Sequence, residues 1–218
     1  LRFMQLTYNN QTPLAGGCYE KKDSGVSRFG EQVIEEMNRL GMIVDLSHAG
    51  KQTCLDAINF SKKPVTISHA NPNFFHQSIR NIDDEVLKLL AKNNGFIGLS
   101  LYPYHLKNYG DCKLEDFCEM INQLVNIMGE DNIGIGSDLC MNWPDSVVMW
   151  MRNGKWTKKI DYGESKNKNA SWPKPLAWYS KPEDISAFLK GMILNGISEK
   201  TAHKIAGSNW LNFMQNHF

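Results

Sequence analysis

The sequence predicts an α/β fold in which a parallel sheet is covered by helices. Five short, mostly apolar segments alternate with amphipathic helical patterns, and this order is typical of parallel strands joined by helices. The five strand candidates are residues 2–8, 42–46, 64–69, 96–101 and 133–138. Two architectures contain such a series: an open five-stranded sheet, and five-eighths of a closed eight-stranded barrel, which typically needs about 250 residues.

The helices are predicted from the spacing of apolar residues and from their end signals. In the first helix, Val33, Ile34 and Met37 lie on one face of a 3.6-residue period, and Gly41 supplies the C-terminal stop. Acidic residues at 83–85 open the third helix, where they favour the helix dipole. The predicted helices are residues 31–40, 51–60, 83–95, 114–128, 182–194 and 198–213.

Composition excludes several classes of function. The 218 residues are 42% hydrophobic and 22% charged, with a net charge of +1, so there is no electrostatic reason to expect nucleic acid or anionic lipid as a partner. No run of 18 apolar residues exists, so no transmembrane segment is expected. The five cysteines form no C-x-x-C pair, which favours free thiols over a disulfide framework or a structural zinc knot.

Two histidines at matching strand ends are the most informative feature of the chain. Residues 41–48 and 64–69 each read as a buried strand that stops on a histidine, His48 and His69. Because parallel strands of neighbouring β-α units end at the same edge of a sheet, both imidazoles are expected side by side there. They predict a metal site, and two hydrogen-bonded core histidines are the alternative.

Charged residues near the same edge are further candidates. Asp138 ends the fifth strand. Its carboxylate has three candidate roles there: a metal ligand, a general base or the N-cap of the next helix. Arg80 follows the second histidine strand; a guanidinium there could hold a substrate carboxylate, although spacing alone favours a solvated surface arginine. Asp45 falls on the strand face opposite His48, which favours a structural hydrogen bond. The other histidines are expected on the surface or in loops: His76, His105, His203 and His217.

Residues 141–180 interrupt the alternation. This segment holds five of the six tryptophans, three prolines and many lysines. Its tryptophan content argues against simple disorder. Long insertions in α/β domains usually lie on the functional face, so it is expected to wall a substrate cleft within a single domain of residues 1–218.

Several motifs in order resemble the membrane (renal) dipeptidase family of zinc metallopeptidases. They are Leu6-Thr-Tyr-Asn9, Gly41-Met-Ile-Val-Asp-Leu-Ser-His48, Pro64-Val-Thr-Ile-Ser-His69, Arg80-Asn-Ile-Asp-Asp-Glu-Val-Leu87, Ile133-Gly-Ile-Gly-Ser-Asp138 and Gly207-Ser-Asn-Trp-Leu211. The resemblance runs along nearly the whole chain and implies a (β/α)8 TIM-like barrel of the metal-dependent hydrolase type, of which these five strands are the fourth to eighth.

The resemblance also implies a reaction, a cofactor and residue roles. The family hydrolyses dipeptides with a hydroxide that bridges two zinc ions. By this resemblance His48 and His69 bind one zinc, Asp138 handles protons or contacts the substrate amine, and Arg80 contacts the substrate carboxylate or the developing oxyanion. Where the family usually has an oxyanion-stabilising histidine, this chain has Tyr8, whose hydroxyl can also donate a hydrogen bond.

The remaining metal ligands of the family are a His-x-Asp pair on the first strand and a shared glutamate on the third. These motifs are not found in the 218 residues, so such ligands would have to come from before Leu1. We therefore expect these 218 residues alone to have no appreciable dipeptidase activity. Two alternatives stay open: a non-catalytic barrel that acts as a binding or scaffold protein, and another amidohydrolase-like deacetylase or lactonase. The sequence leaves the oligomeric state, the compartment and the preferred dipeptides open; a homodimer and a bacterial cytoplasmic or periplasmic location are the candidates.

Overall fold

The computed structural model describes residues 1–152 and 171–218, and it contains one parallel sheet of five strands. The strands are β1 (Phe3–Gln5), β2 (Ile43–Asp45), β3 (Thr66–Ala70), β4 (Phe96–Leu99) and β5 (Ile133–Ile135). Each strand pairs with the next one along the chain. This sequential order is that of successive strands in a (β/α) barrel, so the predicted α/β class is confirmed.

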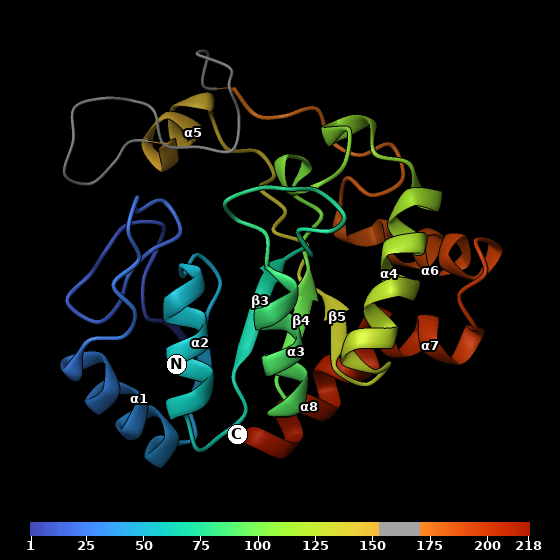
Figure 1. Cartoon of the computed structure of the whole chain (residues 1–218). Helices are drawn as coiled ribbons and strands as arrows, with labels where there is room; N and C mark the ends of the chain where they lie inside the picture. Colours follow the sequence, from blue (N-terminus) through green and yellow to red (C-terminus); the bar gives the residue numbers. More distant parts are fainter. Residues whose placement is uncertain (153–170) are drawn as a thin grey trace.

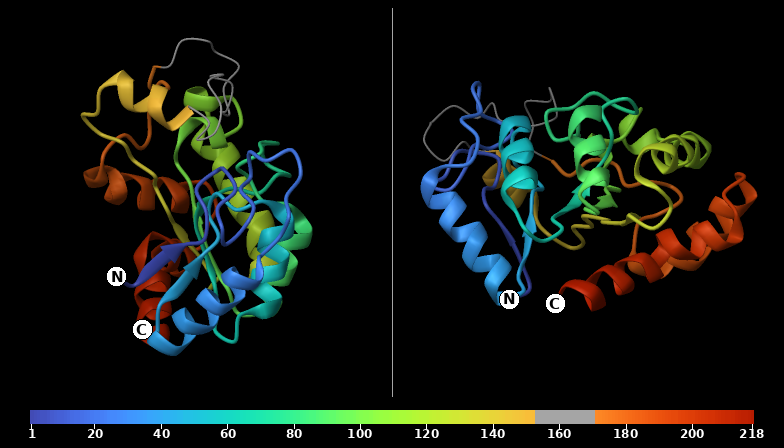
Figure 2. Two further views of the ribbon diagram at one scale, coloured as in Figure 1. Left: turned by 90° about the vertical axis from the view of Figure 1, so that its left-hand side faces the viewer. Right: turned by 60° about the horizontal axis from the view of Figure 1, so that its bottom comes forward.

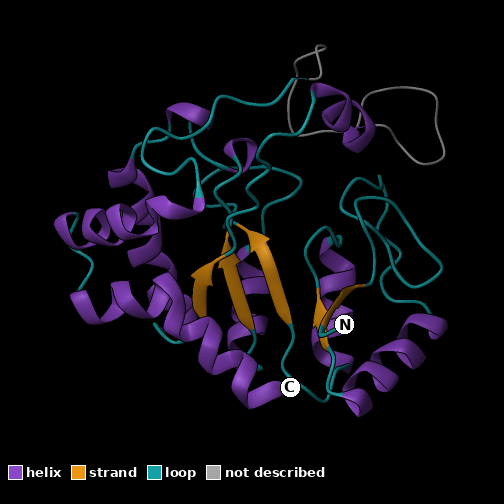
Figure 3. Cartoon of the chain, turned by 180° about the vertical axis from the view of Figure 1, so that it is seen from behind, coloured by secondary structure: helices purple, strands orange, loops and turns teal. Residues whose placement is uncertain are grey.

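Helices follow the strands as the sequence predicts. The first four are α1 (Arg28–Leu40), α2 (Lys51–Phe60), α3 (Asp84–Lys92) and α4 (Leu114–Met128), and the later ones are α5 (Asp145–Arg152), α6 (Ile185–Leu194), α7 (Glu199–His203) and α8 (Asn209–His217). Helices α2, α3 and α4 lie in front of the sheet in Figure 1. Figure 3 shows the opposite side of the sheet, which the C-terminal helix crosses.

Local signals explain where individual helices begin and end. The predicted bounds of α2 and α4 agree with the structure, whereas α1 begins three residues earlier than predicted, at Arg28. The reason is that the Ser27 side chain accepts a hydrogen bond from the Gly30 amide and so caps the helix. Gly41 adopts a left-handed conformation and ends α1, as its position predicts.

The strands are shorter than the sequence predicts. Strands β1, β2, β4 and β5 have only three or four residues each. Strand β3 is longer but changes register between Ile67 and Ala70, next to β4. The residues beyond the short strands, which apolar runs alone assign to the strands, form the loops at the carboxyl edge of the sheet.

The core has two parts, one on each side of the sheet. The larger cluster lies between the strands and the outer helices and includes Val44, Ile97 and Ile133 from the strands. The smaller cluster joins Ile43 and Phe96 of the strands to Phe213 of α8, with Phe3 and Trp210 packed against it. Phe96 and Trp210 rings lie 4.2 Å apart between centroids, and Trp210 Nε1 donates to the Ile135 carbonyl at 2.9 Å. Helix α8 therefore anchors on the side of the sheet opposite the outer helices.

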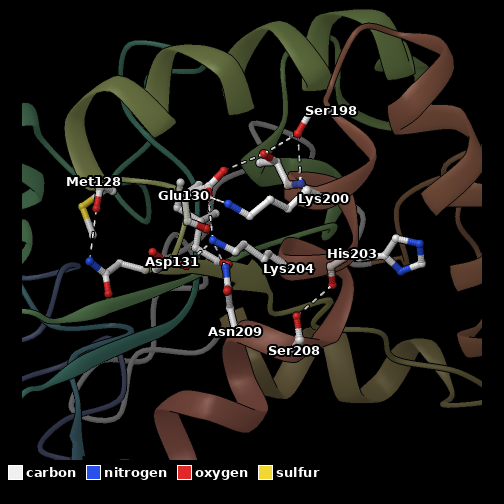
Figure 4. A network of polar contacts seen from close by, with 12 residues as sticks. Met128, Glu130, Asp131, Ser198, Lys200, His203, Lys204, Ser208 and Asn209 are labelled. Atoms are coloured by element: carbon white, nitrogen blue, oxygen red, sulfur yellow. Dashed lines mark hydrogen bonds and ion pairs between the residues drawn. The ribbon is translucent and has the colours of Figure 1, made fainter.

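The C-terminal helical segment is not the single α-helix predicted for residues 198–213. It consists of α7, a π-helical turn at Lys204–Ser208, and α8. Ser198 caps α7 by accepting from the Thr201 amide, as expected for a lone N-cap. In a π-helix, residues five apart lie one above the other, so Lys204 and Asn209 reach the same side. There Lys204 pairs with Glu130 and Asp131, and Asn209 donates to the carbonyls of Glu130 and Ile133 (Figure 4).

The predicted insertion at 141–180 lies partly outside the described residues, of which 141–152 and 171–180 belong to it. All five cysteines are free thiols, as expected. No helix in the described part of the chain is long and apolar enough to cross a membrane. The two termini lie close together, with the Arg2 guanidinium 5.3 Å from the centre of the Phe218 ring (Figure 2).

Candidate metal centre

The structure brings His48 and His69 together at the carboxyl edge of the sheet. Their Nε2 atoms are 2.8 Å apart and their ring centroids 4.9 Å apart, so the predicted juxtaposition is confirmed. His69 lies within β3, while His48 lies three residues beyond the end of β2. His48 reaches the same place through a left-handed backbone conformation, with a φ of +70°. This conformation is uncommon for a residue other than glycine.

Residues after β1 fix the ring of His48. Its Nδ1 atom lies 2.6 Å from Oδ1 of Asn9. The Tyr8 ring stacks on the imidazole with a centroid distance of 4.1 Å. Tyr8 is itself partly exposed, so it forms the solvent side of this stack. The Leu6-Thr-Tyr-Asn9 segment thus places both an aromatic ring and an amide against the first histidine.

A network of two serines and a carboxylate holds His69. Its Nδ1 atom is 2.9 Å from Ser68 Oγ, and Ser68 Oγ donates to Asp45 Oδ2 at 2.6 Å. The backbone N–H of His69 donates to Ser47 Oγ at 3.0 Å. Asp45 also accepts from the backbone amides of Ser47 and Ser68. The expectation that Asp45 makes a structural hydrogen bond is therefore confirmed.

Burial keeps both imidazoles in their neutral form. It holds the pKa of His48 well below its ordinary value, and the nearby Arg80 guanidinium lowers that pKa further. Burial also lowers the pKa of His69, although the Asp138 carboxylate acts in the opposite direction. Neutral imidazole is the form that binds a metal ion. The electrostatics of the pair therefore suit metal ligation near neutral pH.

Arg80 lies inside the protein rather than on its surface. Its side chain is only 2% exposed, so the expectation from spacing alone, a solvated arginine, is wrong. One guanidinium nitrogen, Nη2, donates to the His69 carbonyl at 3.4 Å. The polar segment after β3 folds back across the sheet edge, where Asn73 N and Ile82 N donate to the carbonyls of Ile82 and Asn71. The burial of Arg80 depends on this folding back, which the spacing of residues in the sequence does not predict.

Asp138 lies at the same edge, three residues beyond the end of β5, with a φ of +52°. It does not cap the next helix, because α5 begins at Asp145. Its carboxylate partly offsets the lowering of the His69 pKa by burial, so the two groups interact electrostatically. Asp138 also lines a cavity of about 80 Å³ together with Tyr102, Trp172 and Tyr179. The described end of the tryptophan-rich insertion therefore contributes to this wall.

The donor set of the histidine pair fits a metal ion but is incomplete as a site. The two Nε2 atoms lie 2.8 Å apart, and imidazole nitrogen is a common zinc ligand. Within residues 1–152 and 171–218, no group of three or more His, Cys, Asp or Glu side chains is arranged to hold a metal. Catalytic zinc sites generally use three protein ligands. Further ligands are therefore required if the pair binds a catalytic metal.

Comparison with known proteins identifies the family. A family model described as membrane dipeptidase, peptidase family M19, matches residues 1–146. The chain belongs to the membrane dipeptidase family. An uncharacterized dipeptidase of Schizosaccharomyces pombe is 34% identical over 147 residues, which cover 63% of this chain and 35% of that protein. The match thus spans about a third of the length of this curated relative.

Two solved structures share the fold of this member of the membrane dipeptidase family. An amidohydrolase from Pseudomonas aeruginosa superposes with a TM-score of 0.90 at 31% identity, over 99% of this chain and 64% of that one. A metallopeptidase from Rhodobacter sphaeroides, solved with a phosphinate mimic of the dipeptide L-Ala-D-Ala, gives a TM-score of 0.76 at 20% identity, over 100% of this chain and 56% of its own. The second likeness shows the fold alone. The five strands are those of a partial (β/α)8 barrel, as the resemblance implies.

Three polar residues of this membrane dipeptidase chain were not identified from the sequence. Asn9 and Ser68 contact the two histidines directly. His105, which was expected on the surface or in a loop, is buried, with Nδ1 2.8 Å from Ser100 Oγ. A signal for Ser68 is present in the sequence, because a serine precedes each of the paired histidines. Asn9 and His105 give no comparable signal, since their roles depend on loops that pack from different β-α units.

Proposed function

We propose that this chain carries part of the active centre of a zinc-dependent dipeptidase. The observation that carries the proposal is the 2.8 Å separation of the His48 and His69 Nε2 atoms, at the carboxyl edge of a parallel sheet in a member of the membrane dipeptidase family. In (β/α) barrels this edge is where catalytic residues gather. His48 and His69 are the residues that would hold one zinc ion, and two ions are expected in a complete site.

When bound, zinc supplies a Lewis acid for the peptide carbonyl and lowers the pKa of a water molecule. The residues of this chain then bind and orient the dipeptide. Arg80 presents a buried guanidinium beside His69, where it would pair with the substrate carboxylate or stabilise the developing oxyanion. Its burial strengthens such a pair, because little water is available to screen the charge.

Asp138 and Tyr8 have complementary roles in this proposal. The Asp138 carboxylate would hold the protonated amino terminus of the dipeptide, or accept a proton during the reaction. The partly exposed Tyr8 ring lies on His48, and its hydroxyl would donate a hydrogen bond to developing negative charge. The cavity that Asp138 shares with Tyr102 and Trp172 would receive a substrate side chain.

The first experiment measures zinc bound per polypeptide by elemental analysis. His48→Gly is preferred to alanine because glycine tolerates the left-handed backbone at this position. We expect His48→Gly and His69→Ala to lose most of the bound zinc. The matched control is His203→Ala, which removes an exposed histidine from α7 and should bind zinc as the wild type does. Unchanged zinc content in both site variants would refute the proposal.

Turnover tests the completeness of the site separately. Since the described residues offer only two histidines at one point, we expect additional protein ligands to be needed for catalysis. Residues 1–218 supplied with zinc should therefore show no appreciable hydrolysis of simple dipeptides. Robust turnover that is lost in His48→Gly would contradict this expectation and show that the chain already contains a sufficient site.

A non-catalytic barrel that binds a partner or ligand is the second candidate. The observation that favours it is the lack of a three-ligand group within the described part of the chain. The two candidates differ in the zinc experiment, because a degenerate barrel has no reason to keep both Nε2 atoms available to a metal. Absence of zinc binding in the folded wild-type protein would favour the non-catalytic candidate.

A further inference from the structure

The protonation of the two rings follows from their hydrogen-bond partners. In a neutral histidine one ring nitrogen carries a proton and the other a lone pair, and the partners decide which is which. His48 Nδ1 lies 2.6 Å from Asn9 Oδ1. An amide oxygen can only accept a hydrogen bond, so His48 Nδ1 must carry the proton. Its Nε2 atom is then left with the lone pair.

The protonation of His69 is set by Ser68, whose own hydroxyl proton is directed by Asp45. Ser68 Oγ has a single proton to donate. It lies 2.6 Å from Asp45 Oδ2 and 2.9 Å from His69 Nδ1. As a carboxylate, Asp45 can only accept, so the serine proton is directed to it. Ser68 Oγ must then accept from His69 Nδ1. The contact of 3.1 Å between Ser47 Oγ and Ser68 Oγ agrees with this direction, because Ser68 Oγ retains a second lone pair.

Neither Nε2 atom then carries a proton, although the two atoms lie 2.8 Å apart, a distance at which one ring could otherwise donate a hydrogen bond to the other. A cation against both Nε2 atoms would remove the repulsion between their lone pairs, and in its absence the hydrogen bonds from Nδ1 to Asn9 and Ser68 oppose that repulsion. We propose that Asn9 and Ser68, the latter backed by Asp45, are positioning residues that fix both histidines in the Nδ1–H tautomer, so that two Nε2 lone pairs converge on one metal ion. This inference rests on the proposed metal function, but the tautomers themselves can be measured without metal.

The backbone helps to keep this arrangement in place. Asn9 has a φ of +59°, a left-handed conformation that asparagine tolerates better than most residues. Gly98 in β4 and Gly136 just after β5 allow the Ser68 carbonyl to lie against them, since a Cβ at either glycine would overlap that oxygen. Ser68 is therefore confined both through its side chain and through its carbonyl group.

The experiment records long-range ¹H–¹⁵N correlations of the histidine rings in the purified, metal-free protein near pH 7.5. The wild type should show Nδ1 protonated and Nε2 unprotonated for both His48 and His69. A wild-type spectrum with the proton on Nε2 of either ring would overturn the inference. This measurement needs no variant, so it does not depend on how well a mutant folds.

Paired variants then separate the two positioning residues. Ser68→Ala should release the tautomer of His69 and leave that of His48 unchanged, whereas Ser68→Thr retains the hydroxyl and should retain the tautomer. Asn9→Gly tolerates the left-handed backbone and removes the acceptor, while Asn9→Asp keeps an acceptor oxygen. Ser208→Ala, which removes an exposed hydroxyl from the π-helical turn, is the matched control.

Zinc affinity, measured by competition with a chelator, is the second readout. Loss of a residue that orients a metal ligand typically weakens metal binding by about 10–100-fold. We expect losses of this size in Ser68→Ala and Asn9→Gly, and wild-type affinity in Ser68→Thr and Ser208→Ala. Zinc binding that is unaffected in Ser68→Ala and Asn9→Gly would refute the positioning roles while the proposed function stands. Wild-type protein that has the expected tautomers but binds no zinc would instead refute the proposed function.

Discussion

Single atoms decide how closely the strands can approach beneath the histidine pair. At Gly136, just beyond β5, a Cβ atom would overlap the carbonyl oxygen of Ser68 and press on the Cα atom of His69. Gly98 of β4 meets the same carbonyl oxygen. The obstacle is backbone, which cannot turn aside as a flexible side chain can. Glycine at these positions therefore lets the backbone of Ser68 and His69 pack closely against β4 and the end of β5.

Gly136→Ala should therefore destabilise the protein and disturb the site together. Overpacking of this kind typically costs about 1–3 kcal/mol. Chemical denaturation would measure the free energy of unfolding, with Gly207→Ala as control because nothing lies within 4 Å of a Cβ there. The control should be neutral or slightly stabilising, since glycine is unfavourable within a helical segment. Equal stability of both variants would show that the sheet edge adjusts freely.

At this scale the sequence predicts chemistry better than environment. The pairing of His48 and His69 follows from two similar strand ends, and the hydrogen-bonding role of Asp45 follows from alternation along β2. The burial of Arg80 does not follow, because it depends on how residues 71–82 fold back over the sheet edge. The contact between Asn9 and His48 does not follow either, since it joins loops 39 residues apart in sequence.

Among the secondary-structure elements, the π-helical turn at Lys204–Ser208 connects the C-terminal helices to the loop before β5. Glu130 is the centre of this connection, with ion pairs to Lys200 and Lys204 and a hydrogen bond from Thr201 (Figure 4). These donors lower the pKa of Glu130 to about 2, with Lys204 contributing most. The charge of this carboxylate thus helps to hold α7 and the π-helical turn against the loop before β5.

This dependence predicts how the stability of a Glu130→Gln variant varies with pH. A carboxyl group whose pKa falls from 4.5 to about 2 on folding stabilises the folded state fully above pH 4.5, and this contribution is lost as the pH approaches 2. The variant should therefore be less stable than the wild type at pH 7, with a difference that narrows between about pH 5 and pH 3. Chemical denaturation across this range measures the difference.

The control for Glu130→Gln is Glu35→Gln, which changes an exposed glutamate on α1. It should leave the free energy of unfolding close to that of the wild type throughout the same pH range, as surface substitutions usually do. A difference between Glu130→Gln and wild type that stays constant from pH 7 to pH 3 would contradict the role assigned to the Glu130 charge.

Element bounds were predictable where local chemistry sets them. Helices α2 and α4 begin and end where the apolar period predicts. The π turn was not predictable, because its stabilising partners Glu130 and Asp131 lie more than 70 residues earlier in the chain. Strand ends were overestimated for a related reason: apolar residues such as Leu101 are buried by the loops at the sheet edge without being paired in β4.

At the scale of the whole molecule, helices pack against both sides of the sheet. The outer helices cover one side, and α8 packs its aromatic residues on the other, where Trp210 contacts Phe3 of β1 and Phe96 of β4. Gly98 and Gly134 provide the space for the indole, because a Cβ at either position would meet it. Strands far apart in the sheet are therefore connected through a single side chain.

Trp210→Ala should lower the free energy of unfolding by about 3–5 kcal/mol, as expected for removing a large aromatic side chain from a packed position. Trp210→Phe keeps an aromatic ring but loses the hydrogen bond from Nε1 to the Ile135 carbonyl, and should cost less. The matched control is Trp143→Ala, since Trp143 is 61% exposed. Equal losses for Trp210→Ala and Trp143→Ala in chemical denaturation would contradict the anchoring role of α8.

At this scale the alternation of strands and helices predicts the α/β class and the order of the sheet. The aromatic cluster beneath it could not be predicted, because periodicity assigns Trp210 and Phe213 to a helix without indicating which side of the sheet that helix covers. The single domain of residues 1–218 and its insertion at 141–180 stay predictions, since part of the insertion lies outside the described residues.

The left-handed residues at the strand ends have an evolutionary consequence. Asn9, His48 and Asp138 follow β1, β2 and β5 with φ values of +59°, +70° and +52°. Besides glycine, asparagine, aspartate and histidine are the residues that best accept this conformation, so the turn and the chemistry select from the same short set. A lineage can exchange one of these residues for glycine or asparagine and keep the turn intact. Such an exchange removes a candidate site residue while the turn of the scaffold stays intact.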